Sequence, residues 1–310
     1  MTGLRSVVTV GAFDGLHLGH QELIREVRER ASSLDALAVV VTFEPHPGAV
    51  LGNPPARLTV PEERAEVLAE LGIDRLYVVR FDPARAAQGA ADFVREVLVE
   101  RCGMRLLVIG ADGGFGKARA ANRRTLPELG ERFGFELVVV NPVPDPSGRP
   151  ISSSGIRAMI NAGELAGAAA RLGRPYRMTA PVVPGAGRGR TTGFRTINLA
   201  GPPPHKALPP DGVYAARVEW GGGVAGAMLN QGARPTVGDA RRTIEAHLFD
   251  FDGDLYGRTV RIEWVERIRD IRRFDSLSAL HSQLEQDRER AYRIVGRTAE
   301  TSTARPVGAR

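Results

Sequence analysis

The chain has 310 residues, of which 43% are hydrophobic and 25% charged, the balance of an ordinary folded protein with room for two domains. Its net charge of +6 arises from 42 basic and 36 acidic residues interspersed along the sequence, and only 6% of residues are aromatic. This pattern favours anionic small molecules over nucleic acid as partners. The single cysteine, Cys102, excludes a disulfide framework. With no signal-peptide pattern and no apolar run long enough to span a bilayer, we expect a cytoplasmic protein without a membrane partner.

The first half of the sequence alternates between predicted strands and helices. Apolar runs predict strands at residues 7–10, 36–43, 76–80, 106–110 and 136–140, and helical periodicity predicts helices at residues 21–32, 61–71, 91–101 and 125–133. This alternation predicts a doubly wound parallel sheet of the α/β class. In such a sheet, ligands bind beyond the carboxyl ends of the strands.

The pattern changes after a predicted helix at residues 156–172 and a hinge at residues 173–176. Short alternating runs separated by Gly- and Pro-rich turns predict strands at residues 179–183, 213–220, 224–229, 243–248 and 259–268, followed by a helix at residues 276–295. This is typical of a small antiparallel β-barrel with a C-terminal helix. We therefore expect one domain at residues 1–175, a second at residues 176–297, and a disordered tail at residues 298–310.

The most informative segment is GAFDGLHLGH at residues 11–20, directly after the first predicted strand. Its two histidines, His17 and His20, stand where the chain passes from a strand into a helix. Backbone N–H groups and the positive end of the helix dipole face a ligand at such a junction, so the segment indicates a polyphosphate site. A glycine-rich turn with a histidine at the helix start is the alternative. The lone cysteine and the lack of a further His-x-x-His pattern argue against structural zinc.

Three further segments follow predicted strands or begin a helix. In TFEPHP at residues 42–47, prolines on both sides hold the backbone of His46 extended. This either directs the imidazole into a binding site or merely forms a rigid turn with a surface histidine. Asp112, in the glycine-rich loop at residues 110–116, either accepts a hydrogen bond from a substrate or forms a turn. ISSSGIR at residues 151–157 reads as a helix cap, yet Arg157 opposes the dipole there, which favours an anionic ligand.

The second domain carries a glycine- and arginine-rich loop, GRGRTTGFRTINL, at residues 187–199. Such a loop can wrap phosphates with backbone N–H groups while the oxygens of Thr196 and Asn198 reach a hard cation, although a basic surface turn is the alternative. Farther along, Glu245 and His247 share one face of a predicted strand. Glu245 is therefore either a general base for a hydroxyl group or one member of a cross-strand charge pair.

Three motifs of the first domain, GAFDGLHLGH, TFEPHP and ISSSGIR in this order, resemble the adenylyltransferase half of prokaryotic bifunctional FAD synthetases. The resemblance implies transfer of AMP from ATP to the phosphate of FMN, which gives FAD and pyrophosphate. His17 and His20 would stabilise charge on the ATP phosphates during this transfer. The resemblance also implies ATP contacts by Gly11, Phe13, Asp14, Gly19, Ser152, Ser153 and Arg157, and flavin contacts by His46, Asp112 and Phe115.

The second domain resembles the riboflavin kinase module of the same enzymes, so the likeness extends over about residues 5–295. It implies transfer of the ATP γ-phosphate to the ribityl 5′-hydroxyl of riboflavin, with Glu245 taking the hydroxyl proton. Thr196 and Asn198 would hold Mg²⁺–ATP, with ATP as co-substrate and Mg²⁺ as cofactor of both heads. ATP contacts are further implied for Gly187, Arg188, Gly189 and Arg190. Riboflavin, FMN and ATP are then the partners, and the oligomeric state stays open.

Several positions depart from the family pattern, among them Ala121, Asn122 and Ser154. Arg195 and Ile197 stand where the family usually has proline and alanine, and Gly113 and Gly114 replace bulkier or polar residues in the loop after Asp112. A paralogue with one active head, or one acting on a modified flavin, is therefore an alternative. A non-catalytic protein that senses flavin or nucleotide is a second alternative, although the intact histidine, threonine, asparagine and glutamate set favours an enzyme.

Overall fold

The computed structural model describes residues 5–117, 120–185, 193–203, 205–233 and 242–299. Internal contacts divide the chain into two units, residues 1–157 and 158–310. This division lies earlier than the boundary expected at residues 175 and 176. The reason is that α8 (Leu165–Leu172) packs on strands β8 (Tyr176–Val183) and β13 (Thr259–Arg269) of the second unit.

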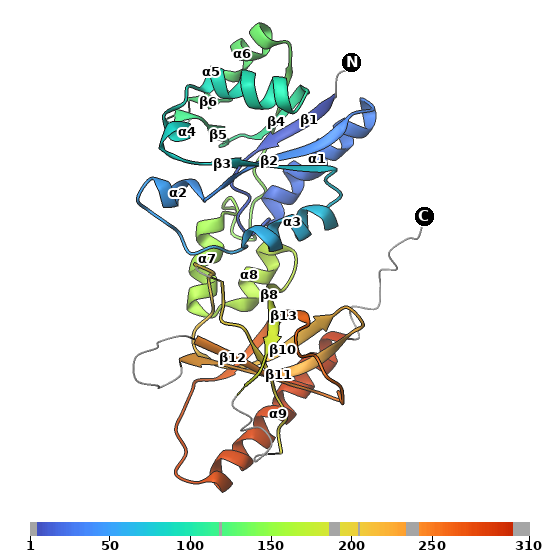
Figure 1. Ribbon diagram of the computed structural model, residues 1–310, viewed down its shortest axis with the longest axis vertical. Helices are drawn as coiled ribbons and strands as arrows, with labels where there is room; N and C mark the ends of the chain where they lie inside the picture. The colour runs from blue at the N-terminus through green and yellow to red at the C-terminus, as the bar shows by residue number, and fades with distance from the viewer. Residues whose placement is uncertain (1–4, 118–119, 186–192, 204, 234–241, 300–310) are drawn as a thin grey trace. The chain divides into compact units, whose positions relative to one another are not determined.

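The first unit is built on a five-stranded parallel sheet with the order β3-β2-β1-β4-β7 (Figure 1). Its strands are β1 (Ser6–Val10), β2 (Leu37–Glu44), β3 (Arg75–Arg80), β4 (Met104–Gly110) and β7 (Glu136–Val140). The larger helices are α1 (Leu18–Ser33), α3 (Pro61–Glu70) and α6 (Leu126–Phe133). Because the strand order reverses beside the central β1, the loops after β1 and β4 lie where ligands bind in such sheets.

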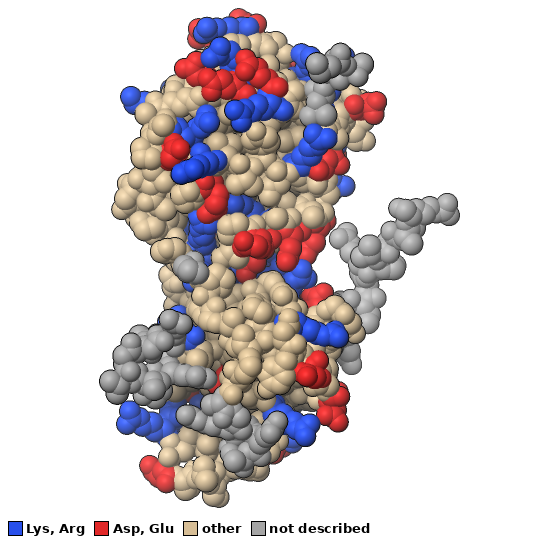
Figure 2. Space-filling model, viewed as in Figure 1, with Lys and Arg blue, Asp and Glu red and all other residues tan. Residues whose placement is uncertain are grey.

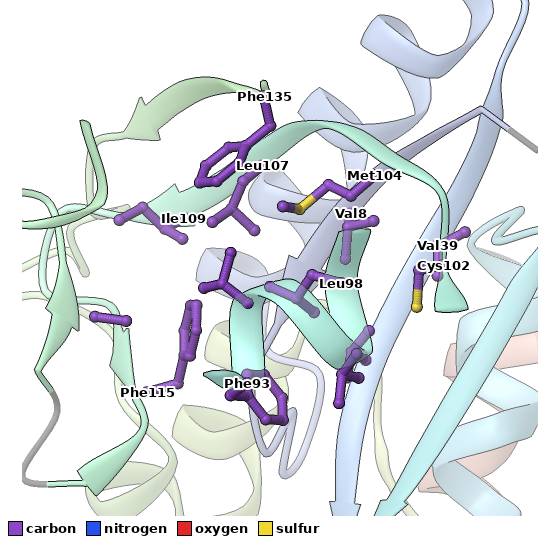
Figure 3. Packing of buried hydrophobic residues seen from close by; sticks show 14 of the residues in the cluster. Val8, Val39, Phe93, Leu98, Cys102, Met104, Leu107, Ile109, Phe115 and Phe135 are labelled. Atoms are coloured by element: carbon purple, nitrogen blue, oxygen red, sulfur yellow. The ribbon is translucent and has the colours of Figure 1, made fainter. Parts of the chain in front are cut away.

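Both faces of this sheet are covered, as the continuous apolar run of β2 predicted. Neighbouring residues of the central strand enter different clusters: Val8 packs with Phe93 and Leu107 on one face, and Val7 packs with Ile24 on the other. Figure 3 shows the first of these clusters, in which Phe93 and Leu98 lie under the sheet residues. The two cores therefore hold β1 rigidly and fix the direction in which the chain leaves it.

The second unit is a closed antiparallel barrel with the strand order β10-β11-β12-β9-β8-β13 (Figure 1). Its other strands are β9 (Ile197–Leu199), β10 (Gly212–Trp220), β11 (Gly223–Ala233) and β12 (Arg242–Leu248). The helix α9 (Leu277–Ala299) packs on β10, β11 and β13. The predicted fold, a doubly wound α/β domain followed by a small antiparallel barrel with a C-terminal helix, is confirmed.

Several predicted element bounds were wrong. The single helix expected at residues 156–172 is two helices, α7 (Ser153–Ala162) and α8, because Gly163 adopts a left-handed φ of 79° between them. The helix expected at residues 91–101 is α5 (Ala90–Phe93) continued by the π-helical η1 (Val94–Arg101).

Other elements had no counterpart among the predictions. They are the short strand β9, the helices α2 (Pro47–Val50) and α4 (Pro83–Ala87), and the two-stranded sheet of β5 (Gly114–Phe115) and β6 (Ala121–Asn122). The helix α9 continues to Ala299, which lies within the tail expected at residues 298–310, and residues 300–310 lie outside the described residues.

Candidate active sites

The turn between β1 and α1 has an uncommon backbone. Phe13 (φ 50°) and Leu16 (φ 45°) both adopt the left-handed region, which costs a bulky residue about 1–3 kcal/mol. Both side chains are buried, at 2% and 0% exposure, in the cluster that also contains Val7. Burial of two large apolar side chains offsets this cost. The turn is thereby held in one shape at the carboxyl end of the central strand.

The two histidines of this turn stack on each other at the start of α1. Their ring centroids lie 3.8 Å apart with an interplanar angle of 18°. His17 is the N-cap residue, and its Nδ1 accepts a hydrogen bond from the backbone N–H of His20 at 3.4 Å. A Cβ at Gly19 would lie 3.3 Å from two atoms of the His17 ring, so glycine permits this close packing. The structure thus brings His17, Gly19 and His20 together at the positive end of a helix.

Asp14 is held by the protein through both carboxylate oxygens. Oδ1 accepts hydrogen bonds from the backbone N–H groups of Leu58 (2.9 Å) and Thr59 (3.0 Å), and Oδ2 lies 3.0 Å from Arg157 Nη2. The Asp14 side chain is 6% exposed, and Arg157 Nε also donates to the carbonyl oxygen of Ala56. These contacts make Asp14 and Arg157 a bridge between the β1–α1 turn and two other segments. Their contacts with ATP stay a prediction.

The serine segment at the start of α7 reaches the same turn. Ser153 Oγ donates to the carbonyl oxygen of Asp14 at 2.8 Å, whereas Ser152 Oγ accepts from the backbone N–H of Gly155 at 3.2 Å. The second contact is a helix cap, as the sequence of this segment indicated. Because α7 and α1 both begin at this turn, two helix N-termini and the histidine pair lie around one place. This arrangement suits a chain of phosphates.

His46 lies beside the Asp14–Arg157 pair. Its Nδ1 accepts a hydrogen bond from the backbone N–H of Gly48 at 3.0 Å. Burial lowers the pKa of His46, and three neighbouring arginines act in the same direction against the opposing charge of Asp14. The imidazole is therefore neutral at pH 7, which agrees with its role as a hydrogen-bond acceptor at Nδ1.

A charged cluster that no motif indicated completes this end of the sheet. Glu44 accepts hydrogen bonds from both Nη atoms of Arg57 (2.9 and 2.8 Å) and from Arg64 Nη2 (3.3 Å). Arg64 is 3% exposed at its side chain, and its Nη1 also donates to the carbonyl oxygen of Ala12 at 3.2 Å. Burial raises the pKa of Glu44, but the two arginines lower it more, so it ends below its ordinary value. The cluster is therefore joined to the β1–α1 turn through the hydrogen bond from Arg64 to Ala12.

Two predicted flavin-binding residues follow β4, Asp112 in the connecting loop and Phe115 in the short strand β5. Asp112 is exposed. Phe115 is 6% exposed, and its ring packs 5.5 Å from that of Phe93 in the cluster of Figure 3. Phe115 thus contributes to the core of the unit, and flavin contact by both residues stays a prediction. The loop glycine Gly113 packs tightly, since a Cβ there would lie 2.8 Å from the carbonyl oxygen of Gly110.

In the barrel, Asn198 and Glu245 lie directly opposite each other. Asn198 on β9 pairs with Glu245 on β12, and Glu245 pairs on its other side with Asn230 on β11. Directly paired residues share one face of a sheet, so these three side chains form a polar row. The neighbouring residue Ala246 is fully buried on the opposite face. A Cβ at Gly185 would lie 2.1 Å from Asn198 Nδ2, so a larger residue there would displace this amide from its present position.

Thr196 precedes β9, two residues before Asn198. The structure therefore brings together three of the predicted kinase residues, Thr196, Asn198 and Glu245. The remaining four, Gly187, Arg188, Gly189 and Arg190, lie outside the described residues. Arg195, which departs from the family pattern, directs its guanidinium outward: it is 85% exposed and lies 3.2 Å from Asp252. The substitution therefore does not fill the space in front of Glu245.

Charges are distributed evenly over the visible surface. Figure 2 shows lysine and arginine interspersed with aspartate and glutamate, without a broad region of one sign on this face. Among the described residues, none of the helices is long and apolar enough to cross a membrane.

The fold and the two polar sites define a two-part transferase, an α/β nucleotidyltransferase-like unit followed by a β-barrel unit. The family model for FAD synthetase matches residues 2–155, and the model for riboflavin kinase matches residues 172–295. The chain belongs to the family of bifunctional riboflavin kinase/FMN adenylyltransferases.

Relatives support this membership over nearly the full length. The bifunctional riboflavin kinase/FMN adenylyltransferase of Bacillus subtilis is 35% identical over 296 residues, 93% of this chain and 92% of that protein. The protein of the same name from Haemophilus influenzae is 36% identical and covers 92% of each chain. A crystal structure named as a macrolide-efflux protein from Streptococcus pneumoniae matches with a TM-score of 0.83 and 35% identity, covering 93% of this chain and 94% of that one.

Proposed function

We propose that this chain phosphorylates riboflavin to FMN in its barrel unit and adenylylates FMN to FAD in its α/β unit, releasing pyrophosphate. The observation that carries the first reaction is the direct pairing of Asn198 with Glu245. The observation that carries the second is the stacked pair of His17 and His20 at a helix start. Family membership supports both. We also propose that the protein works in the cytoplasm.

In the adenylyltransferase, the β1–α1 turn positions the ATP phosphates. His17 and His20 neutralise charge that develops on the α-phosphate and on the departing pyrophosphate as the FMN phosphate attacks. Ser152, Ser153 and Arg157 hold the pyrophosphate end at the start of α7. The close packing of Gly19 against His17 keeps the phosphate chain near the backbone N–H groups of α1.

The flavin side of this reaction is assigned to the loops after β2 and β4. Neutral His46 offers a hydrogen bond from Nε2, because its Nδ1 is already an acceptor. Asp112 accepts from an N–H of the flavin. Arg57 and Arg64 add positive charge near the FMN phosphate without leaving Glu44.

In the kinase, Glu245 takes the proton of the ribityl 5′-hydroxyl as that oxygen attacks the γ-phosphorus of ATP and ADP departs. Thr196 and Asn198 fit Mg²⁺ well, because hydroxyl and amide oxygens beside a carboxylate are the donors that this ion prefers. When bound, Mg²⁺ neutralises charge on the phosphates. Asn230, on the other side of Glu245, helps to keep the carboxylate facing this site.

The test incubates the purified chain with riboflavin, ATP and Mg²⁺ and separates the flavin products. We expect FMN and then FAD. His20→Ala should abolish FAD formation from supplied FMN and leave riboflavin phosphorylation intact. His20 is preferable to His17 here, because the His17 ring also caps α1.

Glu245→Gln should abolish FMN formation and leave adenylylation of supplied FMN intact, since glutamine keeps the size of the side chain but accepts no proton. If the wild-type chain forms neither product, the proposed function is wrong. If either substitution removes both activities, the assignment of the two reactions to separate units is wrong.

A further inference from the structure

The backbone connection between β9 and β12 ends just before the threonine of the kinase site. In the described part of this ladder, the last pair is Ile197 with Ala246. Beyond it, a side chain makes the connection: His247 Nδ1 lies 2.8 Å from the carbonyl oxygen of Arg195. A carbonyl oxygen only accepts hydrogen bonds, so Nδ1 carries the proton and donates it. This bond spans Thr196, which lies between Arg195 and Ile197.

The ring of His247 is held in place by aromatic neighbours. It packs edge-on against Phe194 at 5.2 Å and against Phe249 at 5.9 Å. Phe194 is 5% exposed and also packs 5.7 Å from His281 of α9. Packing against two phenylalanine rings therefore fixes the orientation of the imidazole that donates the hydrogen bond to Arg195.

The side chain of Arg195 adds little restraint to this backbone. The ion pair between Arg195 and Asp252 is 85% and 94% exposed at its two side chains, and such pairs contribute little. Arginine also lacks the fixed φ of the proline that the family usually has at this position. The Arg195 carbonyl, together with the buried ring of Phe194, therefore holds the segment leading to Thr196 to the rest of the barrel.

We propose that His247 is a positioning residue of the kinase site. Through its hydrogen bond to the Arg195 carbonyl, it keeps Thr196 beside Asn198 and in front of Glu245, so that the nucleotide with its Mg²⁺ meets a preformed set of oxygen atoms. The inference rests on the proposed kinase function. It predicts that loss of this one hydrogen bond weakens nucleotide binding about tenfold.

Two substitutions at His247 separate the hydrogen bond from the bulk of the ring. In His247→Asn, the side-chain amide N–H lies near the former Nδ1 and can still reach the carbonyl. In His247→Gln, the amide N–H lies near the former Nε2 and cannot. Asp252→Asn is the matched control, because it removes the ion-pair partner of Arg195 and leaves the carbonyl contact in place.

For each variant, three quantities are measured: the KM for ATP and the kcat of riboflavin phosphorylation, the affinity for ADP with Mg²⁺ by calorimetry, and adenylylation of supplied FMN. The glutamine variant should raise the KM for ATP and weaken ADP binding about tenfold. The asparagine variant and Asp252→Asn should stay within about threefold of wild type, and adenylylation should not change. Tryptophan fluorescence checks the barrel, since Trp220 and Trp264 both belong to it.

The inference is overturned if the glutamine variant binds ADP like wild type, if asparagine costs as much as glutamine, or if Asp252→Asn has the same effect. A fall in kcat with unchanged ADP affinity also contradicts it. Should the glutamine variant not fold, His247→Ala takes its place with the same expected loss. Absence of phosphorylation by the wild-type chain would refute the proposed function instead, and ADP binding would still decide the role of His247.

Discussion

Replacement of Asp14 by alanine should destabilise the α/β unit strongly. The substitution removes the acceptor of two buried backbone N–H groups, those of Leu58 and Thr59, and the partner of Arg157. The Arg157 side chain is only 18% exposed, so water compensates it poorly. Breaking a buried ion pair in this way costs about 3–5 kcal/mol of unfolding free energy. FAD formation should fall as well, because the β1–α1 turn and the start of α7 lose their common anchor.

The assay is urea unfolding followed by far-UV circular dichroism and by tryptophan fluorescence. Both tryptophans lie in the barrel, so fluorescence reports that unit, while the ellipticity also reports the α/β unit. Asp14→Ala should move the circular dichroism transition to lower urea. Asp14→Asn keeps an oxygen acceptor and should cost less, about 1–3 kcal/mol.

The matched surface control is Glu22→Gln. It breaks the exposed pair with Arg25, whose side chain is 51% exposed, and should cost less than about 0.5 kcal/mol. The reasoning is refuted if Asp14→Ala costs under about 1 kcal/mol, or if it is no more damaging than Asp14→Asn. In that case, the bridge between the three segments would not contribute to the stability of the unit.

Three further predictions concern other parts of the chain. Gly185→Ala should abolish riboflavin phosphorylation and spare adenylylation, because the added Cβ would lie 2.1 Å from Asn198 Nδ2. Gly221→Ala is the control, because no atom lies within 4 Å of its Cβ. Retention of kinase activity by Gly185→Ala would contradict this reasoning. Burial raises the pKa of the Cys102 thiol to about 11, so a thiol reagent at neutral pH should label the chain only after unfolding, and rapid labelling of the native chain would be the opposite result. The net pKa of Glu44 is lowered in the folded chain, so its contribution to stability is present above the unfolded value and is lost as the pH falls through the folded value. Acid titration of unfolding should therefore show a weaker pH dependence for Glu44→Gln than for wild type below about pH 5, and identical profiles would contradict this.

Much of the architecture was predictable from the sequence because each layer leaves a distinct pattern. The continuous apolar run of β2 indicated a sheet covered on both faces, and the structure has a cluster on each. The break between α7 and α8 was missed, because a single glycine within a helical pattern does not reveal whether its φ is positive. The strand β9 was missed because its three residues are too short for a period of two to show.

The candidate sites were predictable where a motif lies within a few residues, as for His17 and His20. The cluster of Glu44, Arg57 and Arg64 was not, because it joins residues from separate segments and resembles ordinary surface charge in sequence. Burial distinguishes this cluster from ordinary surface charge, since the Arg64 side chain is only 3% exposed, and burial cannot be read from the sequence. The core role of Phe115 was not predictable either, because its place in a glycine-rich segment gives no sign of burial; its flavin contact, which the resemblance implies, stays a prediction.

The left-handed backbone at Phe13 and Leu16 has a consequence for attempts to make this protein more heat-stable. Glycine at either position would relax the main chain but would leave a void where a large side chain now fills the core. A substitution at either residue that relieves the backbone strain therefore loses the stabilisation that the buried side chain provides. Substitutions intended to raise the melting temperature are better directed to surface helices far from this turn, where propensity alone decides the outcome.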